Sequence, residues 1–231
     1  MRIGGFQALS LLDFPTVPCS IIFTQGCPLR CQYCHNPDLV LPKKIQANIS
    51  IDFEDIFSYV SSHSSMIQGV CITGGEPTLQ RDLEEKIRRL RDAGFVIKLD
   101  TNGCSPRILE KLIGDSLLDY VAMDIKAPWG RYDLVSPGIS PFIIDACHES
   151  FDILQSSGVS HEFRTTIFPA VHTIDDFVTM ASGLIDGTLY CLQDIRYETT
   201  LASLEPVYTL KADAIAGLLC ERFPSLIIQV R

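Results

Sequence analysis

The sequence has no run of apolar residues long enough to span a membrane, although 46% of its 231 residues are hydrophobic. Its first residues lack the basic head, the long apolar stretch and the small-residue cleavage site of a secretory signal. It also contains no linker rich in proline, glycine or serine and no short-period repeat. These absences favour a cytoplasmic protein without a membrane partner, folded as a single domain over residues 1–231.

Basic residues are in the minority. The chain has 19 lysines and arginines against 28 aspartates and glutamates, which gives a formal net charge of −9. An acidic chain repels phosphate backbones, and its one basic cluster, residues 86–91, alternates with apolar residues as a solvated helix face does. We therefore expect no nucleic-acid partner.

The nine cysteines are an odd number, and in a reducing cytoplasm thiols stay free, bind metal or take part in chemistry. Six are scattered singly, and most of these are expected to be small buried apolar residues. The other three, Cys27, Cys31 and Cys34, form a C-x3-C-x2-C pattern on a loop punctuated by glycine and proline. This group is therefore the place to look for metal chemistry.

Short apolar or β-branched runs alternate with longer segments of helical period, which indicates repeated βα units around a parallel sheet. The runs predict strands at residues 19–24, 70–73, 95–100, 120–126, 162–168, 189–193 and 226–230. Apolar residues at helical spacing predict core-facing helices between them, for example Leu79, Leu83, Ile87 and Leu90. Six such units would curve into a single-domain, open partial (β/α)6 TIM-type barrel with parallel strands. Its ligand site would lie at the carboxyl ends of the strands.

Three thiolates close together can hold one face of an iron-sulfur cluster, because soft sulfur ligands select such clusters or zinc. A 4Fe-4S cluster needs four ligands, so three cysteines leave one iron open for an external molecule. A zinc site completed by His35 or a distant cysteine is the alternative. Structural zinc motifs usually pair two knuckles, and this sequence has only one.

The cysteine loop follows the first predicted strand and carries Tyr33 just before its third cysteine, which resembles the signature of the radical S-adenosylmethionine (SAM) superfamily. Gly74, Gly75 and Glu76 end the next predicted strand and resemble the SAM-binding GGEP motif of that superfamily. Glycines let main-chain groups approach a ligand closely, and carbonyls or a carboxylate can accept from the SAM ammonium. The resemblance implies a 4Fe-4S cluster and SAM as cofactors.

Two more strand ends resemble motifs of the glycyl-radical-enzyme activases. Asp100, Thr101 and Asn102 close the third predicted strand, and Asp124 and Lys126 close the fourth. The resemblance implies that the lysine helps to hold the SAM carboxylate. It also implies that the two aspartates lie at a monovalent-cation site beside SAM. From the residues alone, the presence of Asp124 and Lys126 at the end of the fourth predicted strand is also explained by an ordinary ion pair between them.

Three further residues are candidates for the SAM site. Arg164 is a charged residue in an otherwise apolar strand pattern, and a buried arginine usually meets an anion. The resemblance identifies that anion as the SAM carboxylate. Gln193 ends the sixth predicted strand and is either a contact to the ribose or adenine or a capping amide. Asn36, which follows the third cysteine, is assigned to the SAM site by the same resemblance.

Residues 34–37 and the opening residues 5–15 are similar to those of the anaerobic ribonucleoside-triphosphate reductase activating proteins, and the resemblance extends across almost the whole chain. It implies a glycyl-radical enzyme as partner, namely anaerobic ribonucleotide reductase, and a low-potential electron donor such as flavodoxin or ferredoxin. It also implies catalytic roles for Lys126 and for Asp13, which would lie near the target glycine loop. Asp13 is equally well explained as a turn residue before Pro15.

Two other functions are compatible with parts of the pattern. One is a radical SAM enzyme that acts on a small molecule, such as 7-carboxy-7-deazaguanine synthase, although such enzymes typically carry an aspartate and a threonine after the third cysteine. The other is a non-enzymatic iron-sulfur or zinc module, which would need a fourth protein ligand. That module would not need the polar residues found at successive strand ends.

Overall fold

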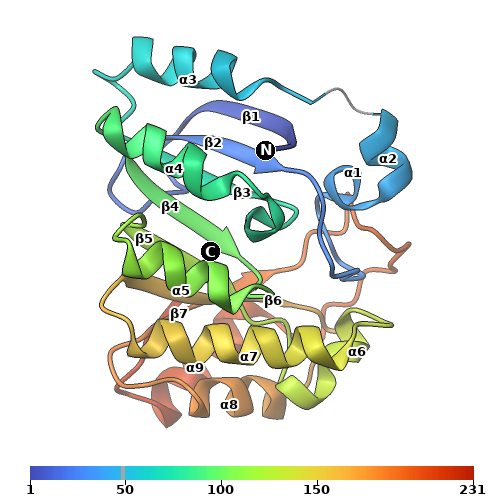
Figure 1. Cartoon of the computed structure of the whole chain (residues 1–231). Helices are drawn as coiled ribbons and strands as arrows, with labels where there is room; N and C mark the ends of the chain where they lie inside the picture. Colours follow the sequence, from blue (N-terminus) through green and yellow to red (C-terminus); the bar gives the residue numbers. More distant parts are fainter. Residues whose placement is uncertain (48–49) are drawn as a thin grey trace.

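The computed structural model describes residues 1–47 and 50–231 and places its strands in one eight-stranded sheet, ordered β1 to β8. Strand β1 (Ile3–Ser10) pairs antiparallel with β2 (Cys19–Thr24), and each later strand runs parallel to the one before it. No ladder joins β1 to β8 within the described residues, so the sheet curves without closing (Figure 1). This confirms the predicted open barrel of parallel strands.

The parallel strands after β2 agree with the predicted runs to within a few residues. They are β3 (Gly69–Gly74), β4 (Val96–Thr101), β5 (Tyr120–Asp124), β6 (Ser160–Ile167), β7 (Leu189–Asp194) and β8 (Ile227–Val230). Strand β5 ends at Asp124, two residues before the predicted end, so Lys126 lies in the loop that follows. Strand β1 has no counterpart among the predicted strands.

Six helices connect successive parallel strands, and they are α3 (Phe53–Ser62), α4 (Leu83–Asp92), α5 (Pro106–Gly114), α7 (Pro141–Ser156), α8 (Ile174–Ser182) and α9 (Ala212–Arg222). Short helices lie in the connections near the carboxyl edge of the sheet, and they are α1 (Pro37–Val40), α2 (Pro42–Ala47), α6 (Tyr132–Val135) and the 3-10 turns η1 (Pro77–Leu79) and η2 (Trp129–Arg131). No helix among the described residues is long and apolar enough to cross a bilayer.

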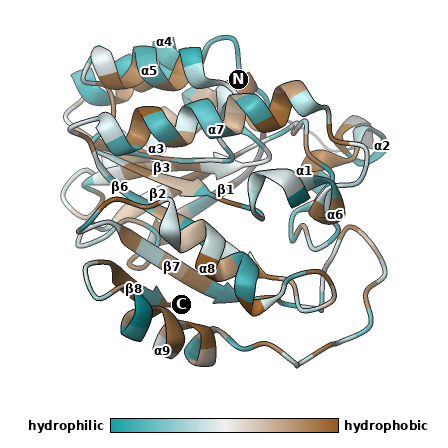
Figure 2. Cartoon of the chain, turned by 90° about the horizontal axis from the view of Figure 1, so that it is seen from below, coloured by the Kyte–Doolittle hydropathy of each residue, from teal (hydrophilic) through white to brown (hydrophobic). Residues whose placement is uncertain are grey.

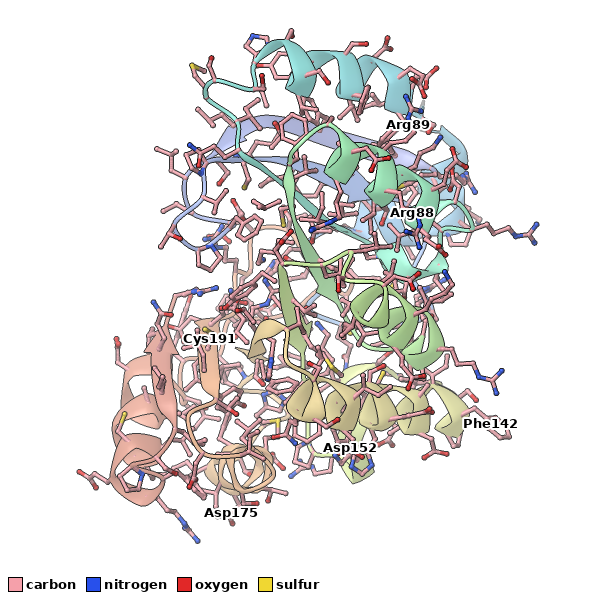
Figure 3. The ribbon with its side chains drawn as sticks, turned by 60° about the vertical axis from the view of Figure 1, so that its left-hand side comes forward. Arg88, Arg89, Phe142, Asp152, Asp175 and Cys191 are labelled. Carbon is pink, nitrogen blue, oxygen red and sulfur yellow. The ribbon has the colours of Figure 1, made fainter. Side chains whose placement is uncertain are left out.

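Each long helix packs an apolar side against the sheet and turns polar residues outward, as the hydropathy colouring shows (Figure 2). In α4, Leu83, Ile87 and Leu90 are buried. Arg88 and Arg89 lie on the outward side of the same helix (Figure 3), and Arg89 pairs with a glutamate of α3. Helix and strand therefore share one continuous apolar core.

The predicted helix containing Leu79 is wrong at its amino end. Leu79 is 45% exposed and belongs to the 3-10 turn η1, whereas α4 begins only at Leu83. Pro77 starts the separate turn, and the side chain of Glu76 accepts a hydrogen bond from the main-chain N–H of Thr78 there. The apolar spacing from Leu79 to Leu83 is therefore not a helical face.

Candidate active site at the carboxyl edge of the sheet

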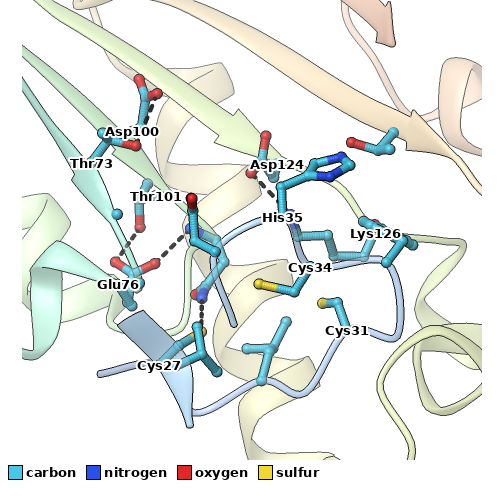
Figure 4. Close-up of a pocket in the computed structure, with 18 of the residues that line it drawn as sticks. Cys27, Cys31, Cys34, His35, Thr73, Glu76, Asp100, Thr101, Asp124 and Lys126 are labelled. Atoms are coloured by element: carbon cyan, nitrogen blue, oxygen red, sulfur yellow. Dashed lines mark hydrogen bonds and ion pairs between the residues drawn. The ribbon is translucent and has the colours of Figure 1, made fainter. Parts of the chain in front are cut away.

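The ends of strands β3 to β7 and the loop after β2 surround a cavity of about 230 Å³ (Figure 4). Every residue that the sequence assigned to the cluster or to SAM lines this cavity: Cys27, Cys31, Tyr33, Cys34, Asn36, Gly74, Gly75, Glu76, Asp100, Thr101, Asn102, Asp124, Lys126, Arg164 and Gln193. It is also lined by residues that the sequence did not single out for SAM, namely Leu29, His35, Val40, Thr73 and Thr166. Residues from six separate chain segments thus meet at one place.

The loop that carries the three cysteines is fixed by hydrogen bonds to its surroundings. The main-chain N–H of Gln32 donates to the carbonyl of Val135 at 3.0 Å, and that of Arg30 donates to the Ser136 hydroxyl at 2.7 Å. The guanidinium of Arg30 folds back to the carbonyl of Cys27 at 2.6 Å. The last residue of α6 and the residue after it therefore hold the loop from outside.

The three thiols are buried or partly buried where they line the cavity. Burial raises the pKa of Cys27 to about 12 and that of Cys31 to about 11, and it also raises the pKa of Cys34. Such thiols stay protonated until a metal displaces the proton. The side-chain amide of Asn102 lies 3.5 Å from the sulfur of Cys27, and the positive charge of Lys126 acts on all three. This donor set fits a cluster held by three cysteines.

The zinc alternative needs a fourth ligand, and His35 lines the cavity but has one ring nitrogen engaged in another contact. Its Nδ1 lies 3.3 Å from the carbonyl oxygen of Thr199, on the loop after β7. Within residues 1–47 and 50–231, no three histidine, cysteine, aspartate or glutamate side chains converge on a single-ion site. The arrangement therefore does not favour zinc bound by this histidine.

The glycine turn after β3 packs directly on the start of the cysteine loop. The main-chain N–H of Gly75 donates to the carbonyl of Thr24 at 2.8 Å, and that of Glu76 donates to Gly26 at 2.7 Å. A Cβ atom on Gly75 would lie 2.2 Å from the carbonyl oxygen of Gly26, which is backbone and cannot move aside. Glycine is required here because two backbone segments touch.

Gly75→Ala is expected to push the glycine turn away from the cysteine loop. We expect a loss of about 2 kcal/mol in the free energy of unfolding, as for other overpacked sites, and a lower iron content after reconstitution. Gly114→Ala is the matched control, because nothing lies within 4 Å of a Cβ atom at that position in α5. Urea unfolding and iron analysis of both variants measure the difference, and equal behaviour of the two would contradict the packing argument.

Glu76 is fully buried, and its carboxylate is held by the protein itself. It accepts from the N–H and hydroxyl of Thr78 at 3.1 and 2.6 Å, from the hydroxyl of Thr101 at 2.7 Å and from the N–H of Asn102 at 2.8 Å. Burial raises the pKa of Glu76, and these donors oppose that effect. The side chain therefore ties the end of β3 to the end of β4 and fixes both turns of the cavity.

A chain of alternating charges crosses the cavity from β4 to the loop after β5. Arg164 on β6 contacts Asp100 at 3.1 Å and Asp124 at 2.9 Å, and Asp124 also contacts Lys126 at 2.9 Å. Burial acts to raise the pKa of Asp124, but Arg164 and Lys126 outweigh it and hold that pKa below its ordinary value. Both aspartates are therefore ionised, and the predicted strand-end ion pair is one link of a larger network.

Asp13 does not line this cavity. It lies on the loop between β1 and β2, where its carboxylate accepts a hydrogen bond from the hydroxyl of Ser10. It borders a second, wider cavity of about 850 Å³ that shares His35, Asn36, Thr166 and Gln193 with the first. Asp13 thus stands beside an open space that leads to the candidate site.

The fold, the three-cysteine loop and the glycine turn define a class of protein. The family model of the radical SAM superfamily matches residues 21–177, and the chain belongs to this superfamily. It is accordingly an enzyme whose family implies a 4Fe-4S cluster and SAM as cofactors.

Curated relatives narrow the class. A Methanocaldococcus jannaschii protein provisionally named glycyl-radical enzyme activating enzyme is 33% identical over 198 residues, which cover 84% of this chain and 80% of that protein. The pyruvate formate-lyase-activating enzyme of Listeria monocytogenes is 33% identical over 174 residues, covering 69% of this chain and 67% of the relative. The similarity to activating enzymes therefore extends well beyond the cysteine motif.

Solved structures share the fold at low sequence identity. Streptococcus suis SuiB bound to S-adenosylmethionine matches with a TM-score of 0.69 at 13% identity, covering 91% of this chain and 49% of SuiB. TYW1 with a lysine-pyruvate adduct bound matches with a TM-score of 0.60 at 19% identity, covering 88% of this chain and 73% of TYW1. The chain spans about half the length of SuiB, and at these identities the likeness concerns the fold alone.

Proposed function

We propose that this chain is an activating enzyme that uses SAM and a 4Fe-4S cluster to generate a glycyl radical on a partner enzyme, with anaerobic ribonucleotide reductase as the first candidate partner. The observation that carries the proposal is the meeting of three thiols, the glycine turn and the Asp124–Lys126–Arg164 network in one cavity. The similarity to activating enzymes supports it. We take residues 1–231 as one radical SAM domain that works in the cytoplasm.

Cys27, Cys31 and Cys34 would hold the cluster. When bound, the cluster supplies the low-potential electron that splits the sulfonium of SAM into methionine and a 5′-deoxyadenosyl radical. Lys126 and Arg164 would bind the SAM carboxylate, since both are cations held at the cavity by partly buried aspartates. The carbonyls of the glycine turn would accept from its ammonium group.

The remaining cavity residues would orient the nucleoside part of SAM. Gln193 at the end of β7 and Asn36 after the cysteine loop carry amides suited to the ribose hydroxyls and the adenine. Tyr33 is buried and packs edge-on against Phe168, with 5.5 Å between the ring centroids. A closed site protects a radical from side reactions.

The partner's target loop would reach SAM through the wider cavity. The two cavities share four residues, so a peptide segment lying in the wider one would end beside the SAM site. Asp13 stands on the wall of that passage, where its carboxylate can contact the incoming backbone or a basic side chain. A glycine Cα–H brought there would give its hydrogen atom to the deoxyadenosyl radical.

Electron paramagnetic resonance tests the proposal. The anaerobically reconstituted enzyme is reduced with flavodoxin or ferredoxin and mixed with SAM and purified anaerobic ribonucleotide reductase. We expect a glycyl radical doublet on the reductase that requires SAM. A parallel reaction contains pyruvate formate-lyase in place of the reductase. A doublet on pyruvate formate-lyase but not on the reductase would change the proposed partner and leave the activating-enzyme function standing. Deoxyadenosine formation without a radical on either glycyl-radical enzyme would contradict the activating-enzyme function.

A further inference from the structure

A lysine with no assigned function lies beneath the candidate SAM site. Lys98 on β4 is 1% exposed, and its ammonium contacts the carboxylate of Asp100 and lies 3.9 Å from the sulfur of Cys71. It precedes Asp100 by two residues, so both side chains lie on the same face of the strand. A fully buried lysine is costly unless it is paired, so a specific need for its charge is the simplest reason for its presence.

Lys98 changes the charge balance of the site. Two carboxylates, Asp100 and Asp124, face three cations, namely Lys98, Arg164 and Lys126, so one positive charge is in excess. Glu162 is the next acidic residue to act on Arg164. Its charge is neutralised by Arg231, which donates to both of its carboxylate oxygens at 2.7 Å. Without Lys98 the four remaining residues, two carboxylates and two cations, would have no net charge.

The position of Lys98 separates its role from that of the other two cations. Arg164 and Lys126 line the cavity, whereas Lys98 does not and therefore cannot touch a ligand there. Burial acts to lower its pKa, but Asp100 outweighs that effect, so the ammonium stays charged. Lys98 would affect a ligand only indirectly, because its ammonium neutralises Asp100 and Asp100 lines the cavity.

We infer that Lys98 is a built-in cation that neutralises Asp100 and so leaves Arg164 and Lys126 free to bind the SAM carboxylate without a bound monovalent metal ion. The inference rests on the proposed function, because it takes SAM as the ligand of this cavity. Lys98 is a positioning residue in this account. The ammonium supplies the charge that a sodium or potassium ion beside the two aspartates would otherwise supply.

Equilibrium dialysis with radiolabelled SAM tests the inference on the anaerobically reconstituted enzyme. In the wild type, replacing sodium and potassium by tetramethylammonium at constant ionic strength should change the dissociation constant of SAM less than about twofold, since no small cation is needed. A tenfold or larger loss of affinity would overturn the inference without any variant. Failure of the wild type to bind SAM in either buffer would instead count against the proposed function.

Two variants separate charge balance from a purely structural role. Lys98→Met removes the excess charge and should weaken SAM binding about tenfold or more. The double variant Lys98→Met/Asp100→Asn removes one cation and one carboxylate, which restores the excess, so its affinity should return to within about threefold of the wild type. Lys111→Met is the matched control, since it deletes a lysine from exposed ion pairs on α5.

The double variant decides the matter even if Lys98→Met folds poorly. If Lys98 only fills space or only stabilises the strand, the double variant should bind SAM no better than the single variant, and that result would overturn the inference. Unchanged affinity in Lys98→Met would do the same. Recovery in the double variant, with wild-type affinity in Lys111→Met, supports the charge-balance role.

Discussion

Cys27→Ala is expected to lower SAM cleavage to the background seen without enzyme. The variant leaves two thiols, and two ligands cannot hold a cubane whose fourth iron must stay open. Iron bound after anaerobic reconstitution should fall from about four atoms per chain to a small fraction of that value. Iron analysis, together with chromatography of the 5′-deoxyadenosine formed under reducing conditions, measures both effects.

Cys220→Ala is the control for this experiment. Cys220 is the exposed cysteine near the end of α9 and lies outside the candidate site, so its loss should leave iron content and SAM cleavage unchanged. Circular dichroism shows whether each variant is folded. Wild-type amounts of deoxyadenosine from a folded Cys27→Ala protein would remove the cluster assignment.

Arg164→Leu is expected to cause a large loss of stability. Arg164 is 13% exposed and bridges Asp100 and Asp124, so its removal leaves two partly buried carboxylates close together with fewer counter-charges. Breaking a buried ion pair from one side typically costs about 3–5 kcal/mol. SAM affinity should also fall, because one of the two cations proposed for the SAM carboxylate is gone.

The stability loss in Arg164→Leu should depend on pH in a specific direction. In the wild type, Arg164 helps to hold the pKa of both aspartates below the ordinary value near 3.8, even though burial acts to raise it. Stability from such groups is fully present above that ordinary pKa and is lost as the pH falls through the lowered one. The difference in unfolding free energy between wild type and variant should therefore be largest near neutral pH and shrink below about pH 4.

Arg88→Leu is the matched control for this change. Arg88 lies on the exposed side of α4 (Figure 3) and pairs with Glu84 of the same helix and with Asp115 at the end of α5. Water screens the charges of such exposed pairs. Its loss should leave the urea midpoint nearly unchanged and should not alter the pH dependence. A comparable loss of stability in both variants would contradict the importance of the buried network.

The sequence was sufficient for the parallel strands because each is a short apolar run that the core requires. Strand β1 was not predicted because residues 3–10 include two glycines and show no clear alternation of apolar and polar residues. The strand is defined by its antiparallel pairing with β2. That pairing is a contact between distant residues, which local pattern does not contain. The wrong placement of Leu79 has a similar origin, since Pro77 and the side chain of Glu76 interrupt an otherwise helical spacing.

The lining of the candidate site could be predicted because strand ends in a parallel sheet must meet at one edge. The hydrogen bonds and ion pairs that join the site residues to one another could not be predicted. Glu76 matches the motif, but only the structure shows that its carboxylate joins the two neighbouring turns. Lys98 carried a usable signal, a charged residue between buried Ile97 and Leu99, and this is the same signal that singled out Arg164. Its partner and its depth were visible only in the fold.

The proposed function requires a 4Fe-4S cluster held by three cysteines, with one iron open to SAM. Electron paramagnetic resonance of the reduced wild-type enzyme, recorded without SAM and with SAM carrying 17O in its carboxylate, tests it most directly. We expect that SAM changes the cluster spectrum and that the 17O label broadens it, because the carboxylate would bind the open iron. Identical spectra from an enzyme that retains its full iron would mean that a protein side chain already fills the fourth position, which would contradict a cluster with one open iron.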